Sequence, residues 1–111
     1  MAAPDPADDA RVDAVFHALA DPTRRHLVEV LAVQPGATAT CLASSLPISR
    51  QAVARHLKLL ADAGLVSRRR RGREALFELD TEPLGAAVAW IGAVGTEWDD
   101  NLAALQRLLG R

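Results

Sequence analysis

The chain has 111 residues, half of them apolar, and carries a net charge of −1 at pH 7. This length fits one small domain, and the apolar fraction excludes a chain that is disordered throughout. The net charge excludes a generally basic protein, but the charge is unevenly distributed: between Ser49 and Arg73, eight Lys and Arg residues accompany a single acid, Asp62. This segment predicts one local surface for a polyanion.

The first residues are acidic and lack an apolar core, so they do not form a signal peptide. The uncharged run Leu84–Thr96 is too short to span a bilayer. One cysteine, Cys41, excludes an intramolecular disulfide and fits a reducing compartment. We therefore expect a cytoplasmic protein that has no membrane partner.

The N-terminal half predicts three helices. Residues 1–7 contain two prolines and form a flexible tail, so the single predicted domain covers residues 8–111. A first helix over Asp8–Ala20 has one apolar face. A second begins at Asp21-Pro22, where the aspartate can cap and the proline needs no N–H, and it ends near Val33. A short helix over Thr40–Leu46 is stopped by Pro47.

The fourth predicted helix, residues 49–62, has one buried side and one basic side. Val53, Leu57 and Leu60 recur at helical spacing, and Ser49 is suited to cap the helix. A short helix, a tight turn and a helix with a polar outer face make a helix-turn-helix, in which the second helix reads DNA. The alternative is an ordinary solvated basic face. The outer face carries Arg50, Gln51, Arg55 and Lys58.

Residues 65–79 predict a two-stranded hairpin that turns near Arg71-Gly72, because apolar residues alternate after the turn. Four consecutive arginines would repel each other in water alone, so the hairpin is expected to meet a polyanion. The alternative is a charged edge that blocks aggregation. The arginines concerned are Arg68, Arg69, Arg70, Arg71 and Arg73.

A last helix over residues about 81–109 is apolar on more than one side, and a chain of this size cannot cover all of it. Gly92 and Gly95 would kink this helix or allow a close helix approach. We predict a homodimer; the alternative is a terminal helix packed wholly on its own domain. The predicted interface residues are Val12, Val15, Phe16, Leu19, Val88, Ile91, Trp98, Leu102, Leu105 and Leu109.

The order of elements predicts a mostly α (α+β) fold: a winged helix-turn-helix with a two-stranded β-hairpin wing and flanking N- and C-terminal dimerisation helices. Three stretches, F-H-A-L-A-D-P-T-R-R, I-S-R-Q-A-V-A-R-H-L-K-L-L-A-D-A-G-L-V and R-G-R-E-A-L-F-E-L-D, closely resemble the ArsR/SmtB family of bacterial transcriptional repressors. The resemblance covers residues 8–80 firmly and the last helix loosely. Trp90 and Trp98, followed by N-L-A-A-L, are similar to the branch that lacks the metal signature.

The resemblance implies a homodimer, built from the first and last helices, that binds double-stranded DNA at an operator in its own promoter region and releases it on a signal. Ala54 stands where many members have a serine beside the groove. His56 touches a phosphate or has a structural role, and both remain open. By position, the resemblance places Ser49, Arg50, Gln51, Arg55 and His56 at the DNA, and Arg68–Arg71 and Arg73 in the wing.

Metal-sensing members of the family have a cysteine pair in the first helix of the helix-turn-helix, or His and acidic ligands in the last helix. Here Cys41 stands alone, one place beyond the second family cysteine, and no histidine lies in the last helix. A transition-metal site needs three or four ligands in reach, so we predict neither a metal nor a cofactor. A redox sensor at Cys41 is an alternative, which requires exposure and nearby positive charge.

The sequence contains no nucleophile motif, phosphate-binding glycine loop or carboxylate pair, so we do not expect an enzyme. We predict a sequence-specific DNA-binding repressor. The alternative from another class is a winged-helix module that binds protein or RNA. The apolar last helix also leaves room for a small hydrophobic effector at the dimer interface, but the sequence identifies neither this effector nor the operator.

Overall fold

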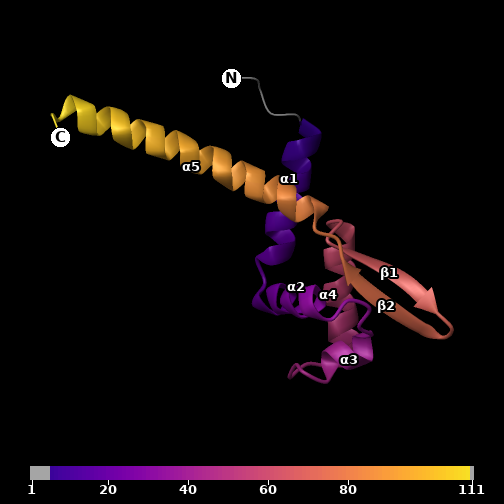
Figure 1. Cartoon of the computed structure of the whole chain (residues 1–111). Helices are drawn as coiled ribbons and strands as arrows, with labels where there is room; N and C mark the ends of the chain where they lie inside the picture. Colours follow the sequence, from indigo (N-terminus) through magenta and orange to yellow (C-terminus); the bar gives the residue numbers. More distant parts are fainter. Residues whose placement is uncertain (1–5, 111) are drawn as a thin grey trace.

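The computed structural model describes residues 6–110 of the chain, which form a winged helix-turn-helix and one long helix (Figure 1). Helix α1 begins two residues before the predicted start, and residues 1–5 of the predicted tail lie outside the described residues. The mostly helical fold with a two-stranded wing is confirmed. The elements are α1 (Pro6–Leu19), α2 (Pro22–Val33), α3 (Ala39–Ala43), α4 (Arg50–Asp62), β1 (Val66–Arg71), β2 (Glu74–Leu79) and α5 (Glu82–Leu108).

Side chains that cap the backbone set most helix boundaries. Asp21 Oδ2 accepts a hydrogen bond from the Arg24 N–H at 3.0 Å at the start of α2. Ser49 Oγ accepts one from the Ala52 N–H at 3.1 Å at the start of α4. Gly64 adopts φ +78° just after α4, the left-handed conformation that ends many helices. These boundaries agree with the prediction.

Helix α3 is shorter than the predicted Thr40–Leu46. Thr38 caps it, and it ends at Ala43. The Ser44 hydroxyl donates to the Cys41 carbonyl at 2.6 Å, and the Ser45 hydroxyl donates to the Leu42 carbonyl at 3.1 Å. These serines bond locally to the carbonyls of the last turn, and such side-chain bonds compete with the continuing helix.

The hydrophobic core lies between α2, α3, α4 and the base of the wing. The predicted stripe of α4, Val53, Leu57 and Leu60, is fully buried. It packs in one cluster with buried leucines of α2, α3 and the residue before β1: Leu27, Leu31, Leu42 and Leu65. The buried stripe leaves the opposite face of α4 exposed to solvent.

The wing is an antiparallel pair in which Arg68 lies opposite Phe77. Gly72 has φ +63° at the turn, which suits the first central residue of a tight hairpin turn. One pairing was not predicted: the Gly36 N–H donates to the Phe77 carbonyl, and the Phe77 N–H donates to the Ala37 carbonyl, both at 2.9 Å. The segment before α3 thus joins the outer edge of β2 and fixes α3 against the wing.

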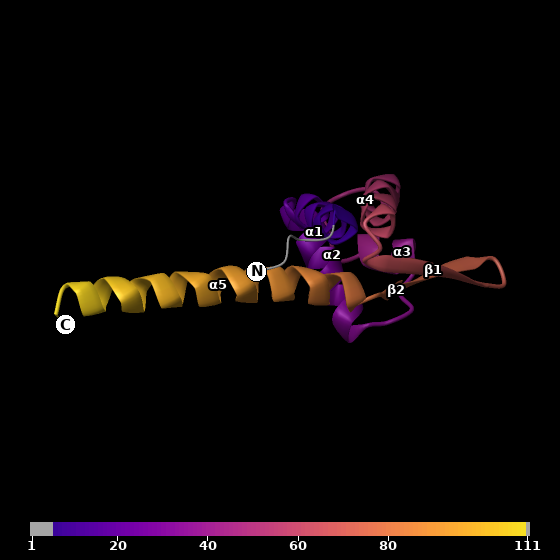
Figure 2. The same ribbon diagram turned by 90° about the horizontal axis from the view of Figure 1, so that it is seen from above.

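Helix α5 runs unbroken through Gly92 and Gly95 and leads away from the winged domain (Figures 1 and 2). At the start of α5, Asp80 Oδ1 accepts a hydrogen bond from the Glu82 N–H at 3.1 Å, whereas the Thr81 side chain makes no cap bond. Among the described residues, no helix is long and apolar enough to cross a membrane.

Helix α1 packs across the first half of α5, where the Phe16 and Trp90 rings meet edge to face with centroids 5.6 Å apart. This packing corrects part of the predicted interface. Val15 is fully buried and Val12 is 8% exposed within the single chain, so neither offers surface to a partner. Leu19 is half-buried against the chain's own core and offers little more.

Candidate nucleic-acid interface

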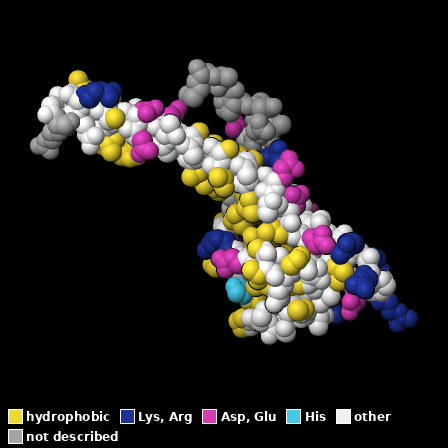
Figure 3. Space-filling model, viewed as in Figure 1, with side chains coloured by type: hydrophobic (Ala, Val, Ile, Leu, Met, Phe, Trp, Pro, Cys, Tyr) yellow, Lys and Arg dark blue, Asp and Glu magenta, His cyan; other side chains and the backbone are white. Residues whose placement is uncertain are grey.

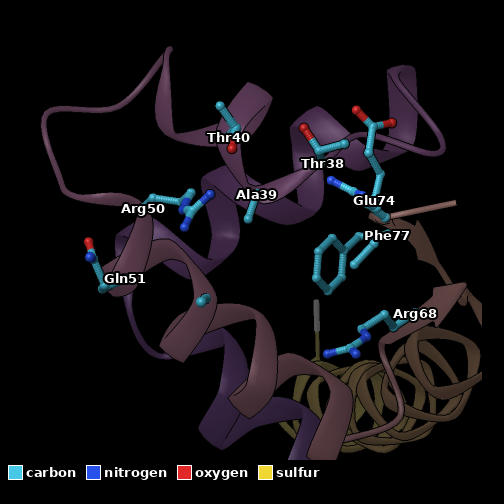
Figure 4. A pocket seen from close by; sticks show the side chains of 11 residues that line it. Thr38, Ala39, Thr40, Arg50, Gln51, Arg68, Glu74 and Phe77 are labelled. Atoms are coloured by element: carbon cyan, nitrogen blue, oxygen red, sulfur yellow. The ribbon is translucent and has the colours of Figure 1, made fainter. Parts of the chain in front are cut away.

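A groove of about 560 Å³ lies between the start of α3, the N-terminal half of α4 and the wing. Figure 4 shows Arg50 on one side of this groove and Arg68 on the other, with the Phe77 ring beside Arg68. The structure therefore brings residues from two predicted DNA-binding segments to one site. The groove is lined by Thr38, Ala39, Thr40, Arg50, Gln51, Ala54, Arg68, Arg73, Glu74, Ala75 and Phe77.

Two periodicities put these side chains in the groove. On α4, Arg50, Gln51 and Ala54 are exposed and lie along one side of the buried stripe of apolar residues. On β1, side chains alternate, so Arg68 and Arg70 share one face with the partners Phe77 and Ala75. Arg69 and Arg71 lie on the other face. The run of four arginines is therefore divided between the two sides of the wing.

Some of the predicted DNA-binding cations have partners within the chain. Arg69 Nη2 lies 3.0 Å from Glu78 Oε1, and Lys58 Nζ lies 3.2 Å from Asp62 Oδ2. Exposed ion pairs of this kind contribute only about 0–1 kcal/mol, so an anionic ligand can compete with them. In the described part of the chain, no ion pair within 4 Å is found for Arg50, Arg55, Arg68, Arg70, Arg71 or Arg73.

These basic side chains are exposed and gather near the wing. In Figure 3, dark blue atoms cluster at the end of the molecule that carries the wing, away from α5. Guanidinium groups present a planar fork that matches phosphate oxygens and the acceptor edge of guanine. A groove rimmed by such groups on a helix and a hairpin is suited to a nucleic-acid strand.

Two predicted contacts have other partners. The Ser49 hydroxyl caps α4. His56 is half-buried, with 23% of its side chain exposed, and its Nδ1 lies 3.5 Å from Arg24 Nη1 and 4.0 Å from Asp21 Oδ2. Its ring therefore contacts the start of α2 and does not line the groove.

Sequence reasoning missed several groove residues. Thr38 and Thr40 line the groove from α3, and Glu74 and Phe77 line it from β2. Hydroxyl residues before a short helix and the alternation along β2 were visible in the sequence. Their position at the groove depends on the pairing of Ala37 with Phe77, which no periodicity indicates.

Residues 19–69 match the family described as helix-turn-helix domain. The chain is 47% identical over 74 residues to the HTH-type transcriptional regulator Rv2034 of Mycobacterium tuberculosis, covering 67% of this chain and 68% of that protein. It is 32% identical over 88 residues to the transcriptional repressor SdpR of Bacillus subtilis, covering 79% of this chain and 97% of that protein.

A solved structure decides the family. The ArsR-like transcriptional regulator from Rhodococcus sp. RHA1 superposes with a TM-score of 0.80 at 35% identity, covering 92% of this chain and 95% of that one. The chain belongs to the ArsR family of winged helix-turn-helix transcriptional regulators. It is a DNA-binding transcriptional regulator, as its sequence predicted.

A second ArsR-type structure shares the fold. It is the homodimeric winged helix-turn-helix DNA-binding domain Mb0332 from Mycobacterium bovis, a possible ArsR-family regulator. Its TM-score is 0.64 at 25% identity, and the match covers 87% of this chain and 92% of that one. At this coverage the match extends beyond the winged domain into part of α5.

In this ArsR-family chain, α5 carries a large exposed apolar face. Val88 and Trp98 are each 65% exposed. Figure 3 shows yellow side chains continuing along α5 beyond the winged domain. The predicted interface residues that remain exposed are Phe16, Val88, Ile91, Trp98, Leu102, Leu105 and Leu109; Trp90, Val94 and Leu108 are exposed with them.

Cys41 is exposed, and its N–H donates to the Thr38 hydroxyl at 3.1 Å. Within residues 6–110, no group of three or more His, Cys, Asp and Glu residues is placed to hold a metal ion. The absence of a metal response remains a prediction for solution experiments.

Proposed function

We propose that this ArsR-family regulator is a homodimeric repressor that binds an inverted-repeat operator in double-stranded DNA. The observation that carries the proposal is the convergence of Arg50 and Gln51 from α4 with Arg68 and Arg73 from the wing around one groove. Two relatives support it, since one is a repressor and the other is a homodimeric DNA-binding domain.

The two elements have different roles in this proposal. Arg50 and Gln51 stand at the N-terminal end of α4, where a recognition helix reaches base edges in the major groove. There an arginine pairs with guanine and a glutamine pairs with adenine. The wing arginines act through phosphate charge or by entering a narrow minor groove.

A second copy of the chain covers the exposed apolar face of α5 in this proposal. Large exposed apolar patches mark interaction sites, and obligate dimer interfaces are more apolar than ordinary surfaces. A two-fold dimer places its two α4 helices in successive major grooves about 34–36 Å apart, which requires an inverted repeat. Repression follows when such an operator overlaps a promoter.

The proposed activity needs neither catalysis nor a cofactor. The protein binds the bacterial chromosome, so we place it in the cytoplasm. Release requires a signal that acts on the dimer, and an apolar effector at the α5 interface is compatible with the surface there. The redox alternative would act through the exposed Cys41.

The test compares two variants on two duplexes. The operator is first located by footprinting the region upstream of the protein's own gene. Gln51→Ala is expected to cost about 1–3 kcal/mol on the operator and far less on random duplex, because it removes a base contact. Arg70→Ala is expected to weaken both duplexes and to lower the salt slope by about one unit, because it removes a phosphate contact.

Arg107→Ala provides the matched control, since this exposed arginine lies in the last turn of α5, away from the groove. It should change neither affinity nor slope. If Gln51→Ala weakened both duplexes equally and Arg70→Ala affected only the operator, the two roles would be reversed. Tighter binding of single-stranded RNA than of any duplex would favour the RNA-binding alternative.

A further inference from the structure

The corner between α1 and α2 is held by one arginine that makes three contacts. Arg24 Nε donates to the Ala18 carbonyl at 2.6 Å, and Arg24 Nη2 donates to the His17 carbonyl at 3.3 Å. The backbone N–H of Arg24 donates to Asp21 Oδ2 at 3.0 Å. These bonds satisfy carbonyls at the end of α1 and orient the guanidinium in one direction.

The remaining nitrogen of this guanidinium faces the recognition helix. Arg24 Nη1 lies 3.5 Å from His56 Nδ1, in the middle of α4. A guanidinium can only donate, so a hydrogen bond between these atoms requires Nδ1 to accept and Nε2 to carry the ring proton. With 23% of its side chain exposed, His56 is directed toward this corner more than toward solvent.

We infer that His56 is a positioning residue, which fixes α4 to the α1–α2 corner through Arg24 and does not itself contact DNA. The inference rests on the proposed function. Helix α1 is in turn packed on α5 through Phe16 and Trp90. The contact therefore connects α4, the recognition helix, through α1 to α5, which forms the proposed dimer interface.

The contact between His56 and Arg24 should affect binding to the operator more than binding to random duplex. In a two-fold dimer, both α4 helices must match successive major grooves at once, so the tilt of α4 relative to α5 determines the fit. Binding to random duplex depends mainly on phosphate charge and tolerates small changes of tilt. Loss of the His56 contact should therefore reduce the preference for the operator.

Three substitutions at position 56 distinguish positioning from a DNA contact. His56→Gln retains an acceptor for Arg24, His56→Leu retains bulk without polarity, and His56→Lys offers DNA a cation but cannot accept from Arg24. We expect His56→Gln to bind the operator within about threefold of wild type, and His56→Leu and His56→Lys to bind about tenfold or more weakly. The salt slope should stay unchanged in His56→Leu.

A lysine variant that binds as tightly as wild type would overturn the inference. So would a leucine variant that weakens both duplexes equally and lowers the salt slope by about one unit, because that is the signature of a lost phosphate contact. Thermal unfolding and light scattering of each variant verify that it is folded and has the mass of the wild type. If the other two variants unfold, His56→Gln still tests the inference, because operator binding by folded His56→Gln that is much more than about threefold weaker than that of wild type would contradict it.

A double-mutant cycle tests the partner, and the chain supplies a matched control. Arg25 Nη1 also donates to a carbonyl at the end of α1, that of Leu19, at 2.6 Å. In the described chain no hydrogen bond joins Arg25 to His56. Arg24→Met and His56→Leu should couple by about fivefold or more in operator affinity, whereas Arg25→Met and His56→Leu should add within about twofold.

Equal coupling for both arginines would overturn the assignment of Arg24. The controls also separate this inference from the proposed function. If wild type binds no duplex, the proposed function fails. If wild type binds the operator and His56→Leu binds it equally well, only the role of His56 fails.

Discussion

The winged domain and the C-terminal helix use their apolar residues in opposite ways. The apolar stripe of α4 is completely buried against α2, α3 and the wing. Helix α5 buries only Pro83 and Ala87 over 27 residues. One region therefore completes its core within a single chain, whereas the other leaves its apolar face for another surface to cover.

The comparison explains why the two regions should respond differently to substitution. A change in the core of the winged domain removes contacts that exist in every single chain. A change on the outer face of α5 removes contacts that exist only after association, so its effect should depend on protein concentration. The following variants test this difference.

The largest effect is expected from replacing both Leu102 and Leu105 with glutamate. These residues are 40% and 51% exposed on α5, and charge there would prevent an apolar interface. Light scattering should detect monomers or insoluble protein. Operator affinity should fall by about 100-fold or more, because two half-sites can no longer be bound together.

Val33→Glu is the matched control, since Val33 is an exposed apolar residue at the end of α2 and not on α5. This variant should keep the mass and the operator affinity of the wild type. Wild-type protein that scatters as a monomer at micromolar concentration would contradict the dimer. A dimeric double-glutamate variant would instead place the interface elsewhere.

The next effect concerns the core of the winged domain. Leu57→Ala should lower the free energy of unfolding by about 2–5 kcal/mol, because Leu57 is fully buried and the truncation leaves a cavity. The measurement is urea unfolding at a fixed protein concentration. Leu59→Ala, two residues along the same helix and 41% exposed, should cost much less. Equal losses for the two leucines would refute the assignment of the buried face.

Local signals in the sequence predicted the winged domain well. Asp21 and Ser49 cap the helices they were expected to cap, because capping depends only on the next few residues. The spacing of apolar residues along α4 identified its buried face, because this spacing is also a local signal. The basic residues of the groove could be predicted because Arg50 is a polar residue beside the buried stripe of α4 and Arg68 and Arg73 belong to the predicted wing.

Contacts between distant elements could not be predicted in this way. Periodicity identifies the apolar side of α1 but not what covers it, so Val12 and Val15 were assigned to the dimer although α5 and the core bury them. His56 shares a helix with the groove residues, yet its ring contacts Arg24. The pairing of Ala37 with Phe77 depends on the tertiary fold alone.

A smaller effect is expected at Asp21, in the corner between α1 and α2. The hydrogen bond from the Arg24 backbone N–H holds the pKa of Asp21 below its usual value, and the charge of the Arg24 guanidinium adds to this. A lowered pKa means that the carboxylate stabilises the fold above the unfolded-state pKa near 3.9, and that this contribution is lost as pH falls through the folded-state pKa.

Asp21→Asn keeps an oxygen that can cap α2 but removes the titration. Urea midpoints between pH 7 and pH 3 should show wild type more stable at pH 7, with the difference from Asp21→Asn shrinking below about pH 4. Asp62→Asn is the control, because its exposed carboxylate caps no helix and pairs only with Lys58 in the described chain. A difference that grows on acidification would have the wrong sign.

The smallest expected effect is that of metal ions, which should change neither region. The family's metal ligands occupy the first helix of the helix-turn-helix or the last helix, so a metal would act on α3 or on α5. In the described residues, α3 offers only Cys41, and α5 has no histidine. Operator affinity should therefore be the same with a chelator and with added zinc, cadmium or arsenite, because a transition metal needs three or four donors and no such group of His, Cys, Asp and Glu residues lies together in residues 6–110. A tenfold loss of affinity at stoichiometric metal would contradict this expectation. Cys41→Ser would then locate the response: if the substitution abolished it, the ion would act through the winged domain, and if the response persisted, ligands shared between two chains would be required.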